Sequence, residues 1–422
     1  MQQDTALILR PVLSGDPRQA EAALAEAVGL ALAIGVEVLE ARSVLVKRPR
    51  AATLLQSGQV AEAAAFVAAH GPAVVIVDGT LTPVQQRNLE KALFAKVIDR
   101  TGLILEIFGE RAVTKEGRAQ VELAALEYQR SRLVRSWTHL ERQRGGAGFM
   151  GGPGERQIEL DRRLLAQRIA GLKREIAEVR RTRGLTRHAR ARAGLPAVAL
   201  VGYTNAGKST LFNALTGAGV EARDALFATL DPTARRVRLP GGDAVFTDTV
   251  GFIADLPTQL VAAFRATLEQ VLFADAIVHV VDAAQADADQ QREDVIEVLE
   301  EMGIAYRRDA RIVEVYNKAD LLAPEARAAL EARCARAEVP AVALSAARGG
   351  GLGALLALVD EVLSGGRTDH DIRLSLSEGR ALAWLYAHGQ VLAREDTDDG
   401  IALRARLTPA AWGRFQAGFG AR

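Results

Sequence analysis

Hydrophobic and polar positions along residues 1–112 alternate in a way that predicts a small α/β domain. Short apolar runs rich in Val, Ile and Leu, bounded by polar residues, are typical of buried strands. Strands are expected at 6–9, 36–39 and 73–77. Segments with apolar residues every three or four positions are typical of helices. Helices are expected at 20–34, 59–69 and 83–94.

The spacing of apolar residues changes over residues 113–194, where it predicts an antiparallel helical hairpin. Alternating steps near three and four residues give the 3.5-residue seam that lets two long helices pack side by side. The seam positions are Leu123, Leu126, Leu133, Trp137 and Leu140 in the first helix and Ile158, Leu165, Ile169, Leu172, Ile176 and Val179 in the second. The glycine-rich stretch 145–154 cannot hold a helix, so we expect it to form the tip.

Residues 195–365 again alternate buried strands with helices, the pattern of a parallel α/β sheet. The clearest strands are 197–201, 244–246, 276–281, 311–315 and 341–344. Residues 366–422 are expected to form a small α/β domain at the end of the chain. Its elements are a strand at 372–376, a helix at 378–388 and a strand at 401–407.

The composition is that of a globular protein in water, with 49% hydrophobic and 25% charged residues. No apolar run reaches the roughly 18 residues that a membrane span needs, and the first residues lack the pattern of a secretion signal. Cys334 is the single cysteine, which excludes a disulfide within the chain and a thiolate metal cluster. We therefore expect a cytoplasmic protein.

A net charge of +1 hides a strong asymmetry along the chain. The segment 113–194 holds 19 Lys and Arg against nine Asp and Glu, so it is basic while the rest of the chain is acidic. A localised basic segment favours contact with a polyanion such as RNA. A solvated helical surface is the alternative interpretation.

The segment 202–209 matches the phosphate-binding loop that joins a strand to a helix in P-loop proteins. Its residues are Gly202, Tyr203, Thr204, Asn205, Ala206, Gly207, Lys208 and Ser209. The glycines let backbone N–H groups turn inward around phosphate oxygens. We expect Lys208 to neutralise the β- and γ-phosphates and the Ser209 hydroxyl to ligate Mg²⁺.

Two further strand ends predict that the bound base is guanine. The residues are Asn317, Lys318, Ala319 and Asp320 at the first end and Ser345, Ala346 and Ala347 at the second. A carboxylate such as that of Asp320 accepts from both guanine N1–H and the exocyclic amine, whereas adenine offers no such pair of donors. A plain turn is the alternative, but the position of this motif, about 110 residues after the glycine loop, favours guanine recognition.

Two segments between these motifs are expected to sense the γ-phosphate. The first contains Phe227, Ala228, Thr229, Leu230 and Asp231, and the second is Asp248, Thr249, Val250 and Gly251. Asp248 can hold the Mg²⁺ shell, and the Gly251 N–H can reach the γ-phosphate. Thr229 is the candidate for the second hydroxyl on Mg²⁺, with Thr233 as the fallback. Lys208, Thr229, Asp248 and Gly251 are therefore the predicted catalytic residues.

These motifs in this order predict a Ras-like P-loop GTPase domain that converts GTP to GDP and phosphate. The predicted architecture is α/β throughout: an N-terminal domain at 1–112, a basic hairpin at 113–194, the GTPase domain at 195–365 and a C-terminal domain at 366–422. Phe252 stands where Ras-type enzymes carry a glutamine that orients water. Because phenylalanine makes no hydrogen bond through its side chain, we expect slow intrinsic hydrolysis that a partner stimulates. The alternative is that Phe252 only packs and another side chain positions the water.

On these residues the chain resembles the HflX family of ribosome-associated GTPases over nearly its whole length. Inside the GTPase domain the resemblance rests on 202–209, 227–233 and 248–252, and outside it on 81–90, 120–124 and 151–157. The resemblance implies binding to the large (50S) ribosomal subunit, both rRNA and ribosomal proteins. It also implies splitting of stalled or stress-damaged 70S ribosomes in the GTP state, with the ribosome stimulating hydrolysis.

Two other functions are compatible with the same residues. One is a GTP-gated protein in signalling or at a membrane, whose hairpin binds protein partners, and a weak membrane association is among the partners that we expect. The other has the N-terminal domain use ATP to remodel RNA, although residues 1–112 hold no second phosphate-binding loop. We expect the protein to be a monomer with guanine nucleotides and the ribosome as its main partners.

Overall fold

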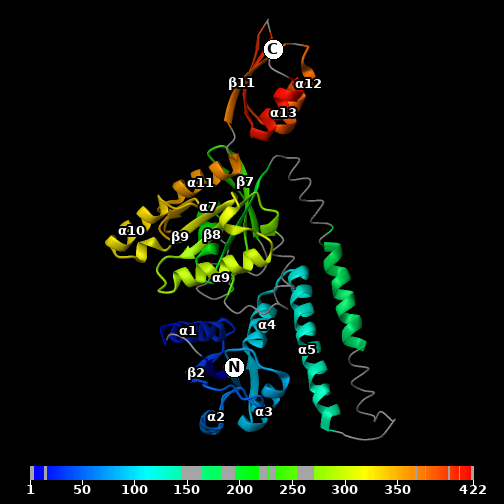
Figure 1. Ribbon diagram of the computed structural model, residues 1–422, viewed down its shortest axis with the longest axis vertical. Helices are drawn as coiled ribbons and strands as arrows, with labels where there is room; N and C mark the ends of the chain where they lie inside the picture. Colours follow the sequence, from blue (N-terminus) through cyan, green and yellow to red (C-terminus); the bar gives the residue numbers. More distant parts are fainter. Residues whose placement is uncertain are drawn as a thin grey trace.

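The computed structural model describes residues 4–13, 17–143, 163–179, 181, 195–217, 227, 233–253, 270–365, 368–375, 377–397, 400–407 and 409–419. Within these residues the chain forms separate β-sheets that follow one another along the long axis of the molecule, with helix α5 beside the N-terminal one (Figure 1). Among the helices that the structure describes, none has both the length and the apolar character of a membrane span. The mixed α/β fold class predicted from the sequence is confirmed.

The N-terminal domain is a parallel sheet, in the order β2-β1-β3-β4, with helices on both faces. Its elements are β1 (Thr5–Val12), α1 (Pro17–Ala33), β2 (Glu37–Leu45), α2 (Ser57–His70), β3 (Val74–Val77), α3 (Pro83–Leu93), β4 (Lys96–Asp99) and α4 (Arg100–Arg111). Alternate residues of each strand face opposite sides, so Ile8 and Ile76 pack under α1 and α4 while Leu7 and Val75 pack under α2 and α3.

The sequence pattern predicted α1, α2 and α3 but not β4 or α4. Asp99 ends β4 and is also the N-cap of α4, where its side chain accepts from the Gly102 N–H at 2.9 Å. A strand that runs directly into a helix leaves no glycine or proline between them, so no turn signal divides the segment. In contrast, Thr82 caps α3 and Pro83 is its first residue, which are the usual signals of a helix start.

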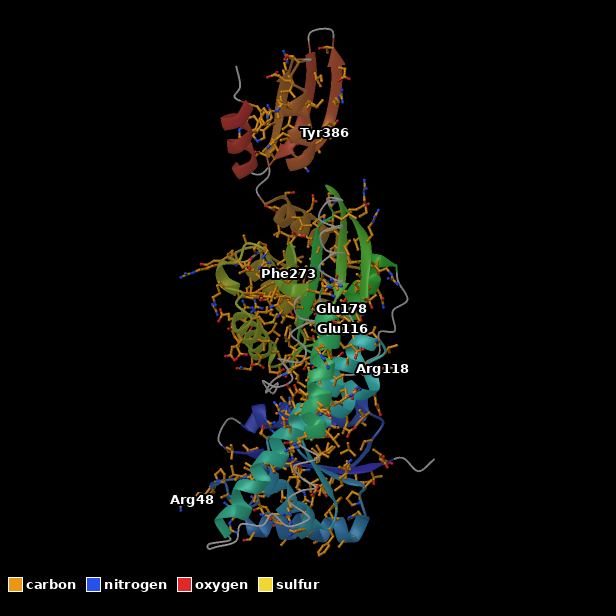
Figure 2. The ribbon with its side chains drawn as sticks, turned by 90° about the vertical axis from the view of Figure 1, so that its right-hand side faces the viewer. Arg48, Glu116, Arg118, Glu178, Phe273 and Tyr386 are labelled. Atoms are coloured by element: carbon orange, nitrogen blue, oxygen red, sulfur yellow. The ribbon has the colours of Figure 1, made fainter. Side chains whose placement is uncertain are left out.

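The predicted hairpin consists of α5 (Lys115–Gln143) and a second helix over residues 163–179. Leu123 of α5 packs against Ile169, Leu172 and Ile176 of the second helix, as the seam predicts. Ion pairs between Lys115 and Glu175 at 3.0 Å and between Arg168 and Glu122 at 2.7 Å join the two helices in an antiparallel arrangement. Figure 2 shows both helices along the N-terminal domain, with Glu116 and Arg118 at the start of α5. The glycine-rich tip, Ile158 and the side chains of Leu133, Trp137 and Leu140 lie outside the described residues.

The predicted GTPase domain contains a sheet in the order β10-β9-β8-β5-β7-β6, in which β6 is an antiparallel edge strand beside otherwise parallel neighbours. Its elements are β5 (Ala197–Gly202), α7 (Lys208–Thr216), β6 (Thr233–Leu239), β7 (Gly242–Asp248), β8 (Ala276–Asp282), α9 (Ala288–Glu301), η1 (Tyr306–Arg308), β9 (Ile312–Asn317), η2 (Ala319–Leu321), α10 (Pro324–Cys334), β10 (Ala341–Ala343) and α11 (Leu352–Ser364). Helices α7 and α11 cover one face through Phe212 and Val359, and α9 covers the other through Leu299.

The last domain is an antiparallel sheet in the order β11-β13-β12, packed against two helices. Its elements are β11 (Thr368–Leu374), α12 (Gly379–His388), β12 (Gln390–Thr397), β13 (Gly400–Leu407) and α13 (Pro409–Phe419). Leu385 of α12 and Phe415 of α13 pack on Leu403 of β13. The sequence pattern predicted β11, α12 and β13, but not β12, because the exposed polar stretch 394–397 hides its alternation.

Candidate nucleotide-binding site

The predicted site residues meet at one edge of the GTPase sheet. Strand β5 pairs in parallel with β7 on one side and β8 on the other, and β8 pairs with β9. The carboxyl ends of these strands therefore share an edge. The glycine loop after β5, Asp248 at the end of β7 and Asn317 at the end of β9 consequently lie around the start of α7.

The glycine loop turns sharply because two of its residues lie where a side chain does not fit. Gly202 has a φ of 149°, and a Cβ there would collide with the Val280 carbonyl. Gly207 has a φ of 88°, and a Cβ there would collide with the Asn317 amide. The turn leads directly into the N-terminus of α7, where the first backbone N–H groups of a helix suit anions.

Lys208, the first residue of α7, places a cation at this edge and is 7% exposed. Its Nζ donates to the carbonyl oxygens of Gly202 at 3.0 Å and Tyr203 at 2.7 Å, which holds the side chain over the glycine loop. Burial lowers the pKa of Lys208 to about 8, although the nearby Asp248 carboxylate opposes this shift. The buried ammonium group favours an anionic ligand that would complete its neutralisation.

Ser209 and Asp248 place two hard oxygen ligands together next to Lys208. The Ser209 hydroxyl donates to Asp248 Oδ2 at 2.8 Å, and Asp248 is fully buried. Gly251 lies close by, since a Cβ there would come within 3.1 Å of Lys208 Nζ and 3.0 Å of Thr204 Cα. Between them, Thr249 donates through its hydroxyl to the Leu200 carbonyl at 2.6 Å, and Val250 is buried.

Phe252 packs in the core, and its side chain offers no polar group to the glycine loop. Its side chain is 3% exposed, and its backbone N–H donates to the Gly202 carbonyl at 3.1 Å. The Thr204 N–H in turn donates to the Phe252 carbonyl at 2.7 Å, which fastens the two loops together. The Thr204 hydroxyl is buried and has no hydrogen-bond partner within the described part of the chain. Slow intrinsic hydrolysis stays a prediction.

Of the segment 227–233, which contains both candidates for the second Mg²⁺ hydroxyl, the structure describes only Phe227 and Thr233. Ala228, Thr229, Leu230 and Asp231 lie outside the described residues. Phe227 is buried, with a φ of 57°. Thr233, the fallback ligand, begins β6 and stands opposite Asp248 in the ladder.

The predicted base-recognition residues form one connected unit with the glycine loop. The Asn317 amide donates to the Ala206 carbonyl at 2.9 Å, and its carbonyl oxygen accepts from the Ala346 N–H at 3.0 Å. Lys318 has a φ of 61° and pairs through Nζ with Asp282 at 2.8 Å. The Ala319 N–H donates to the Leu344 carbonyl, so both predicted strand ends are held side by side, with Ala347 exposed beyond them.

Asp320 is held ionised at the rim of this unit. A hydrogen bond from Ser345 and the nearby Arg348 guanidinium lower the pKa of its carboxyl group. The Arg348 Nε lies 3.0 Å from Asp320 Oδ2, while 73% of the Arg348 side chain is exposed. Sequence reasoning missed Arg348, because nothing in the spacing of a glycine-rich loop indicates where an arginine will fold back.

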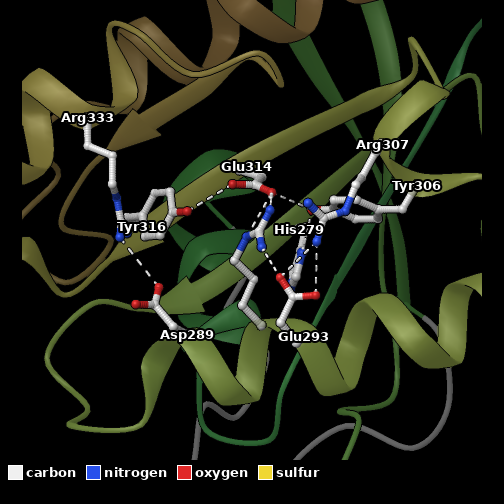
Figure 3. Close-up of polar contacts among 9 residues, drawn as sticks. His279, Asp289, Glu293, Tyr306, Arg307, Glu314, Tyr316 and Arg333 are labelled. Atoms are coloured by element: carbon white, nitrogen blue, oxygen red, sulfur yellow. Dashed lines mark hydrogen bonds and ion pairs between the residues drawn. The ribbon is translucent and has the colours of Figure 1, made fainter.

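A second cluster of buried polar residues lies under α9 and is made of other residues than the nucleotide loops (Figure 3). His279 Nδ1 is 2.6 Å from the Tyr306 hydroxyl, which donates to Glu314 Oε1 at 2.9 Å. Arg292 and Tyr316 also donate to Glu314. Burial lowers the pKa of His279 to about 3, so the ring is neutral and the charges of Glu314 and Arg292 balance. The cluster is part of the core.

Comparison with known proteins gives a consistent result along the chain. Family models match in the order "GTP-binding GTPase N-terminal" at 21–109, "GTP-binding GTPase Middle Region" at 111–190, "50S ribosome-binding GTPase" at 197–318 and "HflX C-terminal domain" at 329–420. Two relatives named GTPase HflX cover almost the same length. That of Magnetococcus marinus is 49% identical over 415 residues, which is 98% of this chain and 94% of the relative.

The second relative, GTPase HflX of Escherichia coli K12, is 44% identical over 398 residues, which is 93% of this chain and 91% of that protein. Identity of this degree over nearly the full length confirms the resemblance seen in the motifs. It also agrees with the meeting of the glycine loop, Asp248 and Asn317 at one sheet edge. The chain belongs to the HflX family and is a GTPase.

Proposed function

We propose that this GTPase binds the large ribosomal subunit and, in its GTP state, splits stalled 70S ribosomes under stress. The observation that carries the proposal is a basic helical hairpin attached to a guanine-nucleotide domain. Exposed cations such as Arg130 and Arg174 lie on its two helices. Arginine forks pair with phosphates and stack on unpaired bases, so the hairpin suits rRNA. The name of the family model that matches residues 197–318, "50S ribosome-binding GTPase", supports the same proposal.

The chemistry at the nucleotide follows from the chain's own residues. Lys208 would neutralise the β- and γ-phosphates, and Asp320 would accept from the guanine N1–H and amine. The converging oxygens of Ser209 and Asp248 fit Mg²⁺, which prefers hard oxygen ligands. Ser209 and Thr229 would ligate Mg²⁺ directly, and Asp248 would hold its water. When bound, the ion would neutralise charge on the β- and γ-phosphates.

The switch would couple the two sites by ordering loops around the γ-phosphate. Gly251 lies next to Lys208, where its N–H would reach the γ-phosphate of GTP but find no partner in GDP. In this proposal the domain at 1–112 and the hairpin at 113–194 act on the ribosome in the cytoplasm. The domain at 195–365 reports the nucleotide, and the domain at 366–422 is an accessory. Phe252 makes the hydrolysis slow until the ribosome completes the site.

Sedimentation of purified 70S ribosomes on sucrose gradients tests this function. The chain with a non-hydrolysable GTP analogue should convert 70S particles into 50S and 30S particles and remain with the 50S fraction, whereas GDP should not. Binding should weaken steeply as salt rises, because phosphate contacts release counterions. Absence from the 50S fraction would remove the ribosome from the proposal. Binding without loss of 70S particles would remove the splitting step.

A matched pair of charge reversals tests the hairpin. Arg130→Glu with Arg174→Glu should abolish binding to 50S particles, while Arg308→Glu with Arg336→Glu changes the net charge equally on the GTPase domain and should not. All four side chains are exposed. Equal losses in the two double variants would mean that the net charge, and not the hairpin, governs binding.

A further inference from the structure

One residue of the glycine loop extends out of the nucleotide site and into the N-terminal domain. Tyr203 is the second residue of the loop and is 5% exposed. Its hydroxyl donates to a carboxylate oxygen of Glu26 in α1, although 177 positions separate the two residues. The carbonyl of the same Tyr203 accepts from Lys208 Nζ at 2.7 Å. One residue therefore joins the phosphate-binding lysine to the other domain.

Glu26 is itself fixed by a chain of buried charges at the edge of the N-terminal sheet. Arg100, at the start of α4, binds Glu26 through Nη2 and Asp78 Oδ1 through Nη1, the latter at 2.7 Å. Asp78 Oδ2 also forms an ion pair with Arg10 Nη1 at 2.7 Å. The Asp78 side chain is fully buried, and those of Arg100 and Glu26 are 4% and 16% exposed. Because each charge is paired and shielded from water, Glu26 has little freedom to move.

Apolar contacts at the same interface involve two other nucleotide loops. Phe227 meets Phe108 of α4 edge to face, with ring centroids 4.7 Å apart. Phe252, which follows Gly251, is buried in the same hydrophobic cluster as Phe108, Tyr203 and Phe227. Tyr203 of the glycine loop thus contacts α1, and Phe227 of the first predicted γ-phosphate segment contacts α4.

We propose that Glu26 and Arg100 are positioning residues for nucleotide binding, which act by fixing Tyr203 and, through it, the glycine loop. A loop whose backbone N–H groups already point inward loses less conformational freedom when the phosphates bind, so affinity rises. Linkage makes the effect reciprocal: bound nucleotide strengthens the contact between the two domains by the same factor. The proposal concerns the GTPase itself and is independent of the ribosome.

A double-mutant cycle on the full chain tests the proposal. Tyr203→Phe removes only the hydroxyl and keeps the ring in its cluster, and Glu26→Ala removes its acceptor. Each single variant should raise the dissociation constant for fluorescent GDP about threefold to tenfold, and the double variant should do no worse than the weaker single variant. The KM for GTP should rise in parallel, while kcat changes less than about twofold, as expected when binding alone is lost.

Tyr306→Phe is the matched control. It removes another fully buried tyrosine hydroxyl of the GTPase domain, one that donates to Glu314 and belongs to the cluster of Figure 3. It should lower thermal stability and leave the GDP dissociation constant unchanged. An equal loss of affinity in Tyr306→Phe would show a general effect of destabilisation and overturn the proposal. An unchanged dissociation constant in Tyr203→Phe, or additive losses in the double variant, would overturn it as well.

Hydrogen exchange gives a readout that does not depend on turnover. Addition of GDP should slow amide exchange in α1 of the original chain and should not do so in Tyr203→Phe, because the link between the loop and α1 is cut. If Glu26→Ala does not fold, Glu26→Gln retains the size of the side chain and replaces it in the cycle. Protection of α1 by GDP that persists in Tyr203→Phe would exclude the hydroxyl as the link.

Discussion

The protein contains two parallel sheets whose carboxyl-terminal edges both carry buried charge, but the charges are arranged differently. At the N-terminal edge, Asp78 forms ion pairs with Arg10 and Arg100. Asp99 accepts a hydrogen bond from Tyr128 at 2.6 Å and forms an ion pair with Arg132 at 2.7 Å. At the GTPase edge, Lys208 donates to the backbone carbonyls of Gly202 and Tyr203 in the glycine loop.

The difference separates an edge that fastens domains from one that takes a ligand. Charges at the first edge are matched by side chains of α1, α4 and α5, so that the edge is filled by the protein itself. Lys208 is buried and, among the residues that the structure describes, forms no ion pair at hydrogen-bond distance, which favours a phosphate as its partner. Parallel sheets commonly bind ligands at this edge, and of the two sheets the GTPase sheet is the one with a glycine loop there.

The largest effect that this comparison predicts is a loss of nucleotide affinity when the cation of the GTPase edge is removed, with little change when a cation of the N-terminal edge is removed. Lys208→Ala should weaken GDP binding by at least about a hundredfold, because it removes the charge-assisted contacts to the β-phosphate. Arg10→Ala, at the corresponding edge of the N-terminal sheet, should change affinity less than about threefold. Titration with fluorescent GDP measures both. GDP binding by Lys208→Ala within tenfold of the original chain would contradict the role assigned to this lysine.

The second-largest effect is expected in Asp320→Asn, which should change the selectivity for the base. The substituted amide can no longer accept from both guanine donors, so affinity for GDP should fall by at least about a hundredfold while xanthosine diphosphate becomes the better ligand. Competition between the two nucleotides for the labelled site measures the ratio. If Asp320→Asn binds GDP normally, the base-recognition element lies elsewhere.

Loss of a charge from the filled edge should reduce stability. Asp78→Ala leaves Arg100 and Arg10 without their shared partner and should lower the free energy of opening of the N-terminal sheet by about 3 kcal/mol, as for other broken buried pairs. Native-state hydrogen exchange of β1 and β3 measures this energy. Glu40→Ala, which removes a half-exposed partner of Arg42, is the control and should cost less than about 1 kcal/mol. Equal costs would mean that the edge is not held by its buried charges.

The sequence predicted which residues meet at the GTPase edge because that edge is built from local motifs. Gly202, Gly207, Lys208 and Ser209 must be close along the chain to form the loop. The motifs that begin at Asp248, Asn317 and Ser345 lie at the ends of strands whose apolar runs are visible in the sequence. Parallel pairing then brings those strand ends together. The confirmed family and α/β fold follow from such local patterns.

Contacts made only by tertiary packing could not be predicted in this way. Tyr203 and Glu26 are 177 positions apart, and α1 shows no pattern that marks Glu26 among its other polar residues. Arg348 pairs with Asp320 across an irregular loop with no period. Spacing along the chain carries information about one element at a time, whereas these pairs depend on how two elements dock.

Proton uptake sharpens the comparison through the pKa of Lys208. With a pKa of about 8, the free lysine is half protonated at pH 8, and bound phosphates should restore its charge, so GDP binding should take up about half a proton at pH 8 and about a tenth at pH 7. Affinity should accordingly fall as pH rises above 8. Calorimetry in buffers of different ionisation enthalpy measures the uptake. Lys208→Arg, which stays charged, should show none, and uptake that is equal in both chains would assign the proton to another group.

The smallest effect is expected at Arg348, whose ion pair with Asp320 makes this part of the binding edge resemble the filled edge. Its Nε lies 3.0 Å from Asp320 Oδ2, so guanine and Arg348 compete for the same carboxylate. Because the arginine is largely exposed and the pair is screened by water, Arg348→Ala should tighten GDP binding only about twofold to threefold. The gain should appear in the association rate and shrink at high salt, as stopped-flow measurement with labelled GDP can resolve. Weaker binding by Arg348→Ala would instead make this arginine a contact of the bound nucleotide.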